Sequence, residues 1–184
     1  MRVVASIVIL ILIAAVAAAG FVYVGGFNVG ADHPDGFAVR WLLHTTMERS
    51  VARHASTVGP APNLDDPGRI REGAEHYKEM CMQCHLAPGM STSEIREGLN
   101  PQPPELAEVE GHMSPQELFW IIKHGVRMTA MPAWGKSHSD QKIWAMVAFI
   151  KHLPGISETQ FRALAAGSAD TYSGHGEAHD HHHD

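Results

Sequence analysis

The chain has 184 residues, two cysteines and a formal net charge of −6 with histidine counted as neutral. This length allows one modest domain with appendages, and the negative charge argues against nucleic-acid binding. Fourteen His and nine Met are many for this length, and both residue types can bind metals.

The first segment, residues 3–24, contains no charged residue and consists mainly of Val, Ile, Leu and Ala. A helix of this length spans roughly 33 Å, which is enough to cross the hydrocarbon core of a bilayer. Arg2 precedes the segment, whereas Asp32 and Asp35 follow it. By the positive-inside rule we expect residues 1–25 to be a single-pass anchor in the cytoplasmic (inner) membrane, with the rest of the chain in the periplasm.

A cleaved signal peptide is the alternative for this segment, because residues 17–19 are alanines of the kind found at cleavage sites. The apolar run continues beyond them through residues 21–24, so it is longer than a normal signal-peptide core. We therefore favour a retained anchor. Both interpretations place the following residues outside the cytoplasm.

Residues 26–67 are expected to form a linker that carries one juxtamembrane helix. Gly, Pro and Asp are dense in residues 25–36 and again in residues 57–67, which is typical of turns. Between them, residues 37–56 place apolar side chains at three- and four-residue spacing, as in a helix. Two interpretations remain open: the helix packs on the next domain, which we favour, or its basic residues meet anionic lipid or an acidic partner.

Both cysteines lie in the stretch Cys81-Met82-Gln83-Cys84-His85, which follows a predicted helix over residues 66–80. The C-x-x-C-H spacing is typical of covalent haem attachment, with one thioether from each thiol and His85 as the proximal iron ligand. A redox disulfide and half of a zinc site are the alternatives. The chain has no second cysteine pair for zinc, and we find no βαβ pattern of the thioredoxin kind.

The segments after His85 predict short helices separated by loops. Residues 114–124 begin with a Ser-Pro-Gln-Glu capping signal and end before a glycine. Residues 140–153 follow a capping Ser139, and a weaker helix is expected over residues 157–166. Since no alternating strand pattern is present, we predict an all-α domain over residues 68–155, followed by residues 156–184 as a short helix and a disordered tail.

A second iron ligand is expected in the loop of residues 126–139. Met131 lies there between two predicted helices and is followed by Pro132, which would stiffen the loop around the sulfur. Electron-transfer haems often take a Met thioether opposite the proximal His. Met128 is the competing ligand, but the sequence context favours Met131.

With these features, residues 68–153 resemble a class I c-type cytochrome domain. They are similar to the single-haem domains found in membrane-anchored cytochromes and in the third subunit of cbb3-type oxidases. Besides the Cys motif, the resemblance rests on Gly73, Tyr77, the helix ending at Gly125, residues 128–134, Trp144 and Phe149. It implies one covalent haem c and a crossing of the first and last helices at Gly73. It also implies Met131 as the distal ligand, and an electron carrier rather than an enzyme.

The chain ends in histidines interleaved with Asp and Glu, a pattern that can bind Cu(II), Ni(II) or Zn(II). The candidate ligands are His175, His179, His181, His182 and His183. A polar end without a role and a purification tag are the alternatives.

We therefore expect a membrane-tethered periplasmic electron carrier that contacts lipid through its N-terminal helix and exchanges electrons with redox partner proteins. It would pass single electrons from a dehydrogenase or quinol-oxidising complex to an oxidase or reductase. Two other functions are weighed against this one. One is a copper-handling protein with an auxiliary haem, and the other is a haem enzyme or ligand sensor with an open distal position.

Overall fold

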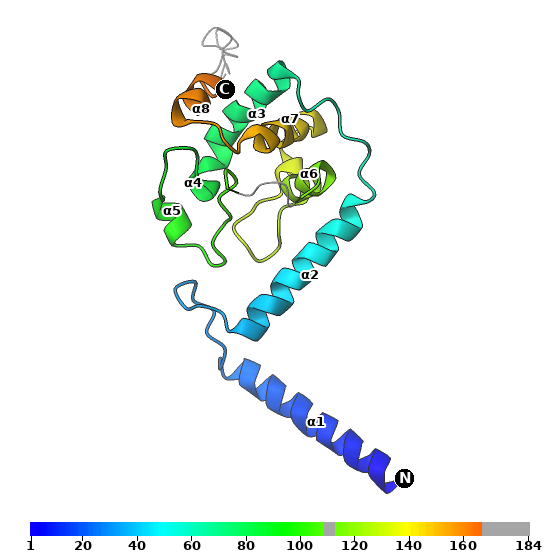
Figure 1. Cartoon of the computed structure of the whole chain (residues 1–184). Helices are drawn as coiled ribbons and strands as arrows, with labels where there is room; N and C mark the ends of the chain where they lie inside the picture. The colour runs from blue at the N-terminus through cyan, green and yellow to red at the C-terminus, as the bar shows by residue number, and fades with distance from the viewer. Residues whose placement is uncertain (109–112, 167–184) are drawn as a thin grey trace, which may run out of the picture. The chain divides into compact units, whose positions relative to one another are not determined.

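The computed structural model describes residues 1–108 and 113–166, and within these ranges the protein is helical and contains no strand (Figure 1). This confirms the predicted all-α class. The helices are α1 (Arg2–Tyr23), α2 (Phe37–Ala55), α3 (Pro67–Met80), α4 (Met82–His85), α5 (Glu94–Glu97), α6 (Pro115–His124), α7 (Asp140–His152) and α8 (Glu158–Leu164), with a 3-10 turn η1 at Trp134–Lys136.

The chain divides into two compact units, residues 1–36 and the part that begins at Phe37. The first unit contains α1, whose 22 residues are long and apolar enough to cross a membrane. None of these residues is buried within this unit. α1 is therefore a candidate single membrane span, whereas the direction in which it crosses remains a prediction.

Local capping explains where the helices of the second unit begin. The Asp66 carboxylate accepts a hydrogen bond from the Arg69 backbone N–H at 2.8 Å and so caps α3. Ser114 and Glu117 form a reciprocal capping box at the start of α6, and Ser139 caps α7. Each cap satisfies a backbone donor that the first helical turn leaves unpaired. The predicted helix starts are confirmed.

One short element departs from the prediction, because the 3-10 turn η1 interrupts the loop predicted for residues 126–139. η1 lies close against α6, because a Cβ atom built on Gly135 would be 2.8 Å from the Lys123 carbonyl oxygen. A tertiary contact of this kind has no signal in local sequence.

α3 and α7 cross at Gly73, as expected. A Cβ atom built on Gly73 would overlap the carbonyl oxygen of Ala145 and lie 2.8 Å from the Cβ of Phe149. Below the crossing, the Tyr77 ring packs on Phe149, with ring centroids 5.2 Å apart. The Phe161 ring of α8 also contacts both of these rings. Glycine at the crossing therefore lets the two main helices of the core approach closely.

The Tyr77 hydroxyl ties α3 to the segment after the Cys motif. Tyr77 is fully buried, and its hydroxyl donates a hydrogen bond to the Leu86 carbonyl oxygen at 2.5 Å. Leu86 itself is buried and has a positive φ of 58°. The bond thus holds the backbone directly after His85, where Leu86 adopts a positive φ.

Tyr77→Phe is expected to lower the free energy of unfolding by about 1–2 kcal/mol, because the buried Leu86 carbonyl would lose its donor. Denaturant unfolding followed by far-UV circular dichroism measures this. Thr46→Val is the matched control, since the Thr46 hydroxyl donates to a backbone carbonyl on an exposed surface. Equal losses in the two variants would contradict the assigned role of Tyr77.

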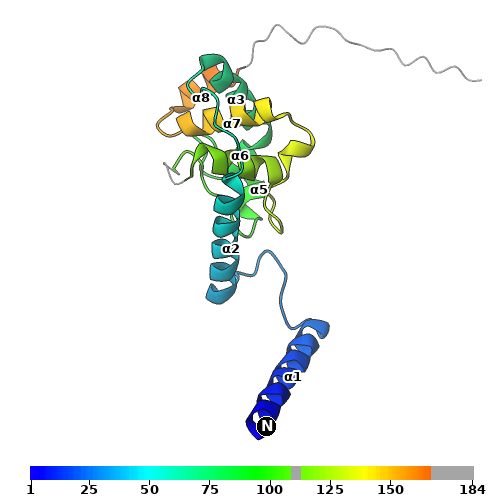
Figure 2. The same cartoon turned by 90° about the vertical axis from the view of Figure 1, so that its right-hand side faces the viewer.

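α2 packs on the domain through its second half. Val51 and Ala55 are buried, and the His54 ring stacks on Trp120 of α6 with centroids 5.3 Å apart. Figures 1 and 2 show the first half of α2 standing clear of the helices that surround α6. The favoured interpretation, packing on the following domain, is therefore confirmed for one half of the helix only.

Candidate functional site

One turn of helix presents all three side chains of the Cys motif. α3 ends at Met80 and is capped by Cys81, whose backbone N–H donates to the Tyr77 carbonyl at 2.9 Å. The backbone N–H groups of Cys84 and His85 both donate to the Cys81 carbonyl, at 3.1 and 2.9 Å. The two thiols and the imidazole therefore come from one short, hydrogen-bonded segment.

The environment of Cys81 does not suit a reactive thiolate. The Cys81 side chain is buried, and this burial, together with the neighbouring Cys84, raises the pKa of Cys81 to about 12. Redox-active C-x-x-C pairs instead contain a thiol with a lowered pKa, so the redox interpretation is disfavoured. A zinc site would need four ligands, and among the described residues no group of three or more His, Cys, Asp or Glu side chains is arranged to hold a metal ion. A thioether requires no charged sulfur in the folded protein.

His85 is oriented by a backbone acceptor. Its Nδ1 lies 2.8 Å from the Pro104 carbonyl oxygen, which accepts the Nδ1–H. Burial lowers the pKa of His85, the Pro104 hydrogen bond opposes this, and the charge of Arg96 lowers it further. A neutral imidazole that carries its proton on Nδ1 leaves the Nε2 lone pair for a metal.

A buried cation lies beside the segment that orients His85. The Arg96 side chain is 11% exposed, and its Nη2 donates to the Pro103 carbonyl at 3.2 Å and pairs with Glu105 Oε1 at 3.0 Å. Arg96 Nε is buried and has no hydrogen-bond partner within the described part of the chain. Haem carries carboxylate groups, and an unused buried donor on a cation fits such a group. The side chains present at the Cys motif are therefore compatible with a haem.

Met131, the predicted distal ligand, lies in a loop that is held by hydrogen bonds between its own residues. The Val126 N–H donates to the Met131 carbonyl at 3.2 Å, and the Met131 N–H donates to the Thr129 hydroxyl at 3.1 Å. Met131 is half-buried and packs against the core cluster that includes Cys81. Met128, the competing candidate, is 90% exposed. The loop therefore separates the two methionines, shielding only Met131.

Several other apolar side chains are half-buried beside this core. They come from α4, α6, η1 and loops far apart in the sequence, and they are Met82, Met90, Leu106, Leu118 and Trp134. An apolar, planar cofactor next to the Cys motif would bury surface of this kind, as in most cofactor sites.

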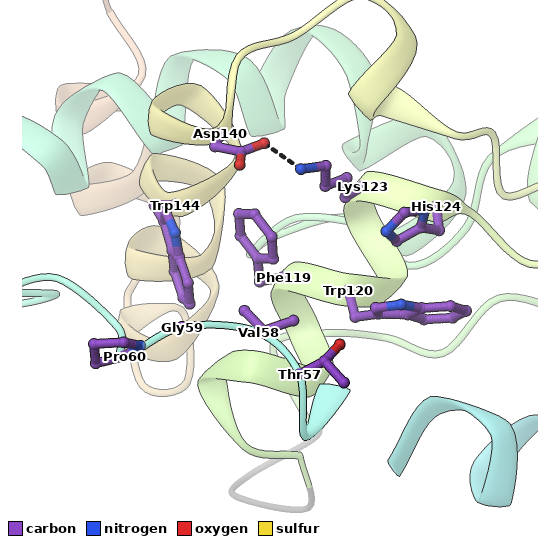
Figure 3. A pocket seen from close by; sticks show the side chains of 10 residues that line it. All are labelled: Thr57, Val58, Gly59, Pro60, Phe119, Trp120, Lys123, His124, Asp140 and Trp144. Atoms are coloured by element: carbon purple, nitrogen blue, oxygen red, sulfur yellow. Dashed lines mark hydrogen bonds and ion pairs between the residues drawn. The ribbon is translucent and has the colours of Figure 1, made fainter. Parts of the chain in front are cut away.

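A separate pocket of about 410 Å³ lies between residues 57–60, α6 and α7. Figure 3 shows Phe119 and Trp144 side by side in it, with Trp120 and His124 along α6. Lys123 Nζ and Asp140 Oδ1 form an ion pair of 2.6 Å that joins α6 to α7. None of the predicted haem residues lines this pocket, which instead marks where the segment after α2 meets the domain.

Sequence reasoning missed one pair of histidines. The His76 and His138 rings meet edge to face with centroids 5.7 Å apart, and the His76 side chain is only 16% exposed. Burial lowers the pKa of His76, and the charge of Lys142 acts in the same direction. Only the turn at η1 brings the two rings together, so no sequence pattern could have indicated the contact.

The tail histidines 175–183 lie outside the described residues. Within residues 1–108 and 113–166, no group of three or more His, Cys, Asp or Glu side chains is arranged to hold a metal ion. The proposed tail metal site therefore remains a prediction from sequence.

Comparison with known proteins identifies one family. The family described as cytochrome c oxidase, cbb3-type, subunit III matches residues 68–150. A solved structure, the Kuenenia stuttgartiensis reducing HAO-like protein complex Kustc0457/Kustc0458, aligns with a TM-score of 0.41 and 21% identity. That alignment covers 54% of this chain and 53% of the matched chain, so this chain spans about half of its length. The comparison with curated proteins gives no match.

Proposed function

Because residues 68–150 form a c-type cytochrome domain of the cbb3-type subunit III family, we propose that the chain is a membrane-tethered carrier of single electrons. A domain of this family implies haem c as the cofactor. We propose one haem, since the chain contains a single C-x-x-C-H motif and no further cysteine. The haem supplies the change between ferrous and ferric iron, and the chain holds and tunes it.

Four residues are proposed to hold the haem. Cys81 and Cys84 would form the thioethers, His85 would offer Nε2 to the iron, and Met131 would offer its sulfur as the second iron ligand. The observation that carries this proposal is the hydrogen bond of 2.8 Å between His85 Nδ1 and the Pro104 carbonyl. It fixes the tautomer that an iron ligand requires.

If His85 and Met131 both bind the iron, no position on it would be left for a substrate. Electron transfer is then the function that the site supports, rather than catalysis or ligand sensing. Redox titration of the full-length protein in detergent should follow a one-electron curve, and carbon monoxide should leave the reduced spectrum unchanged. Rapid formation of a carbonyl complex would instead favour the haem enzyme or sensor.

α1 is proposed to keep the carrier at the periplasmic face of the inner membrane. The redox partners would be a dehydrogenase or quinol-oxidising complex as donor, and an oxidase or reductase as acceptor. Crosslinking in native membranes, followed by co-purification, would name these proteins. Protease added on the periplasmic side should digest the haem domain. If digestion requires the inner membrane to be made permeable first, the domain lies in the cytoplasm and the proposed orientation is wrong.

A second candidate function rests on the tail sequence. We expect the full-length protein to bind Cu(II) more tightly than a chain that ends at residue 174, because neutral imidazoles interleaved with carboxylates are copper ligands. The difference should shrink as the pH falls below about 6, where imidazoles become protonated. Calorimetric titration of both chains with Cu(II) measures it, and equal affinities would remove the copper-handling alternative.

A further inference from the structure

Exposed apolar side chains gather at one end of α2. Phe37, Trp41, Leu42 and Leu43 are 79%, 59%, 57% and 56% exposed. Among the described residues from 37 onward, the only other large apolar side chains with such exposure are Ile95 and Met128. The first seven residues of α2 therefore form an apolar tip, residues 37–43, on a unit whose surface is otherwise poor in such side chains.

The tip is apolar around its circumference. Successive helical residues are turned by about 100°, so Leu42 and Leu43 lie on different sides of the helix from Phe37 and Trp41. No single neighbouring helix could cover all four side chains. Lipid, which can surround the helix on several sides at once, would cover all four.

The tip is also held in a fixed direction. The second half of α2 is anchored on α6 by the buried Val51 and by the stack of His54 on Trp120. Figures 1 and 2 both show the first half extending away from the helices of the same unit. The apolar side chains are therefore presented at the end of a stalk that is continuous with the haem domain.

The chain itself limits what the tip can reach. α1 ends at Tyr23, and residues 24–36 span at most about 45 Å when fully extended. Phe37 therefore lies within about that distance of the end of α1, so it can reach the surface of the membrane in which α1 is proposed to lie. Aromatic side chains favour the lipid–water interface, and Arg40, the one charged residue in the tip, can extend its guanidinium towards the headgroups.

We propose that residues 37–43 of α2 insert into the lipid–water interface of the membrane that α1 spans. This rests on the proposed membrane tether. α2 then acts as a second attachment point to the membrane. In this arrangement the apolar side chains make the main contact with lipid, and the basic residues of the helix contribute less. Because the other half of α2 is packed on α6, insertion restricts the height and tilt of the haem domain over the bilayer. The haem would face only those redox partners that lie near the membrane surface.

Site-directed spin labelling tests the insertion. Both natural cysteines are proposed to be consumed by the haem, so Leu42→Cys provides the only free thiol for a nitroxide in the full-length holoprotein. The protein is reconstituted into vesicles of phosphatidylethanolamine and phosphatidylglycerol. Collision of the label with oxygen, which concentrates in lipid, is then compared with collision with a water-soluble nickel chelate.

Two further labels make the result decisive. Ala52→Cys places the label on an exposed position of the packed half of α2, and Leu12→Cys places it in α1. We expect the label at position 42 to favour oxygen, as at position 12, and the label at position 52 to favour the nickel chelate. Leu43→Cys repeats the test if the first variant does not attach haem.

The other outcomes overturn the insertion. A label at position 42 that favours the nickel chelate places the tip in water, whereas a label shielded from both reagents indicates that a second copy of the chain covers it. If the label at position 12 is also in water, the proposed tether itself fails. The redox titration of the same samples shows independently whether electron carriage stands.

Discussion

Replacing Met131 with His is expected to lower the midpoint potential of the haem by on the order of 100 mV or more. A thioether stabilises ferrous iron relative to a second imidazole, and the identity of the axial ligand sets haem potentials over a range of roughly 0.8 V. Met131→Ala should instead leave the distal position open, so that carbon monoxide binds to the reduced protein. Spectroelectrochemical titration and the carbonyl spectrum measure the two effects.

Met128→Ala is the matched control for both variants. Met128 lies in the same loop, but it is 90% exposed and does not pack against the core. Its replacement should leave the potential and the reduced spectrum as they are. If the change at position 128 opens the haem and the change at position 131 does not, the proposed distal ligand is wrong.

Gly73→Ala is expected to lower the free energy of unfolding by about 3 kcal/mol or more, because the added methyl group would overlap the backbone of the facing helix. The obstructing group is the Ala145 carbonyl, which cannot move without shifting α7. Since α3 also leads into the Cys motif, we expect less covalently attached haem in cells. Denaturant unfolding and the haem-to-protein absorbance ratio measure the two effects.

Gly98→Ala separates the crowding from the intrinsic effect of removing a glycine. A Cβ atom built on Gly98 would lie 3.7 Å from its nearest neighbour, which is an ordinary contact, and its φ of −84° suits any residue. This variant should be as stable as the parent, or slightly more so. A Gly73 variant of parental stability would mean that α3 and α7 do not approach as closely as described.

The chemistry of the haem site could be predicted from sequence because it depends on local spacing. Cys81, Cys84 and His85 are held together by one turn of helix, and the helix starts at Asp66, Ser114 and Ser139 are set by side chains within three residues. The resemblance to c-type cytochromes and the all-α class follow from the same local signals, and both are confirmed. The axial ligands remain proposals.

Other features depend on side chains that are far apart in the sequence. The partner of the Tyr77 hydroxyl, the Arg96–Glu105 ion pair beside His85 and the shielding of Met131 but not Met128 all require the folded loops. Periodicity could indicate that residues 37–56 form a helix. It could not indicate that only the second half has a protein partner, because that depends on where α6 lies.

By itself, the sequence determined the haem motif, the helical class and the apolar first segment, since each depends on residues within a few positions of one another. Only the tertiary structure decided which methionine is shielded, which imidazole nitrogen of His85 remains available, and which end of α2 stays uncovered. The physical reason is that the burial of a side chain and its hydrogen-bond partners depend on how the helices and loops pack against one another. Here that packing is set by the close crossing of α3 and α7 at Gly73 and by the contact of α2 with α6.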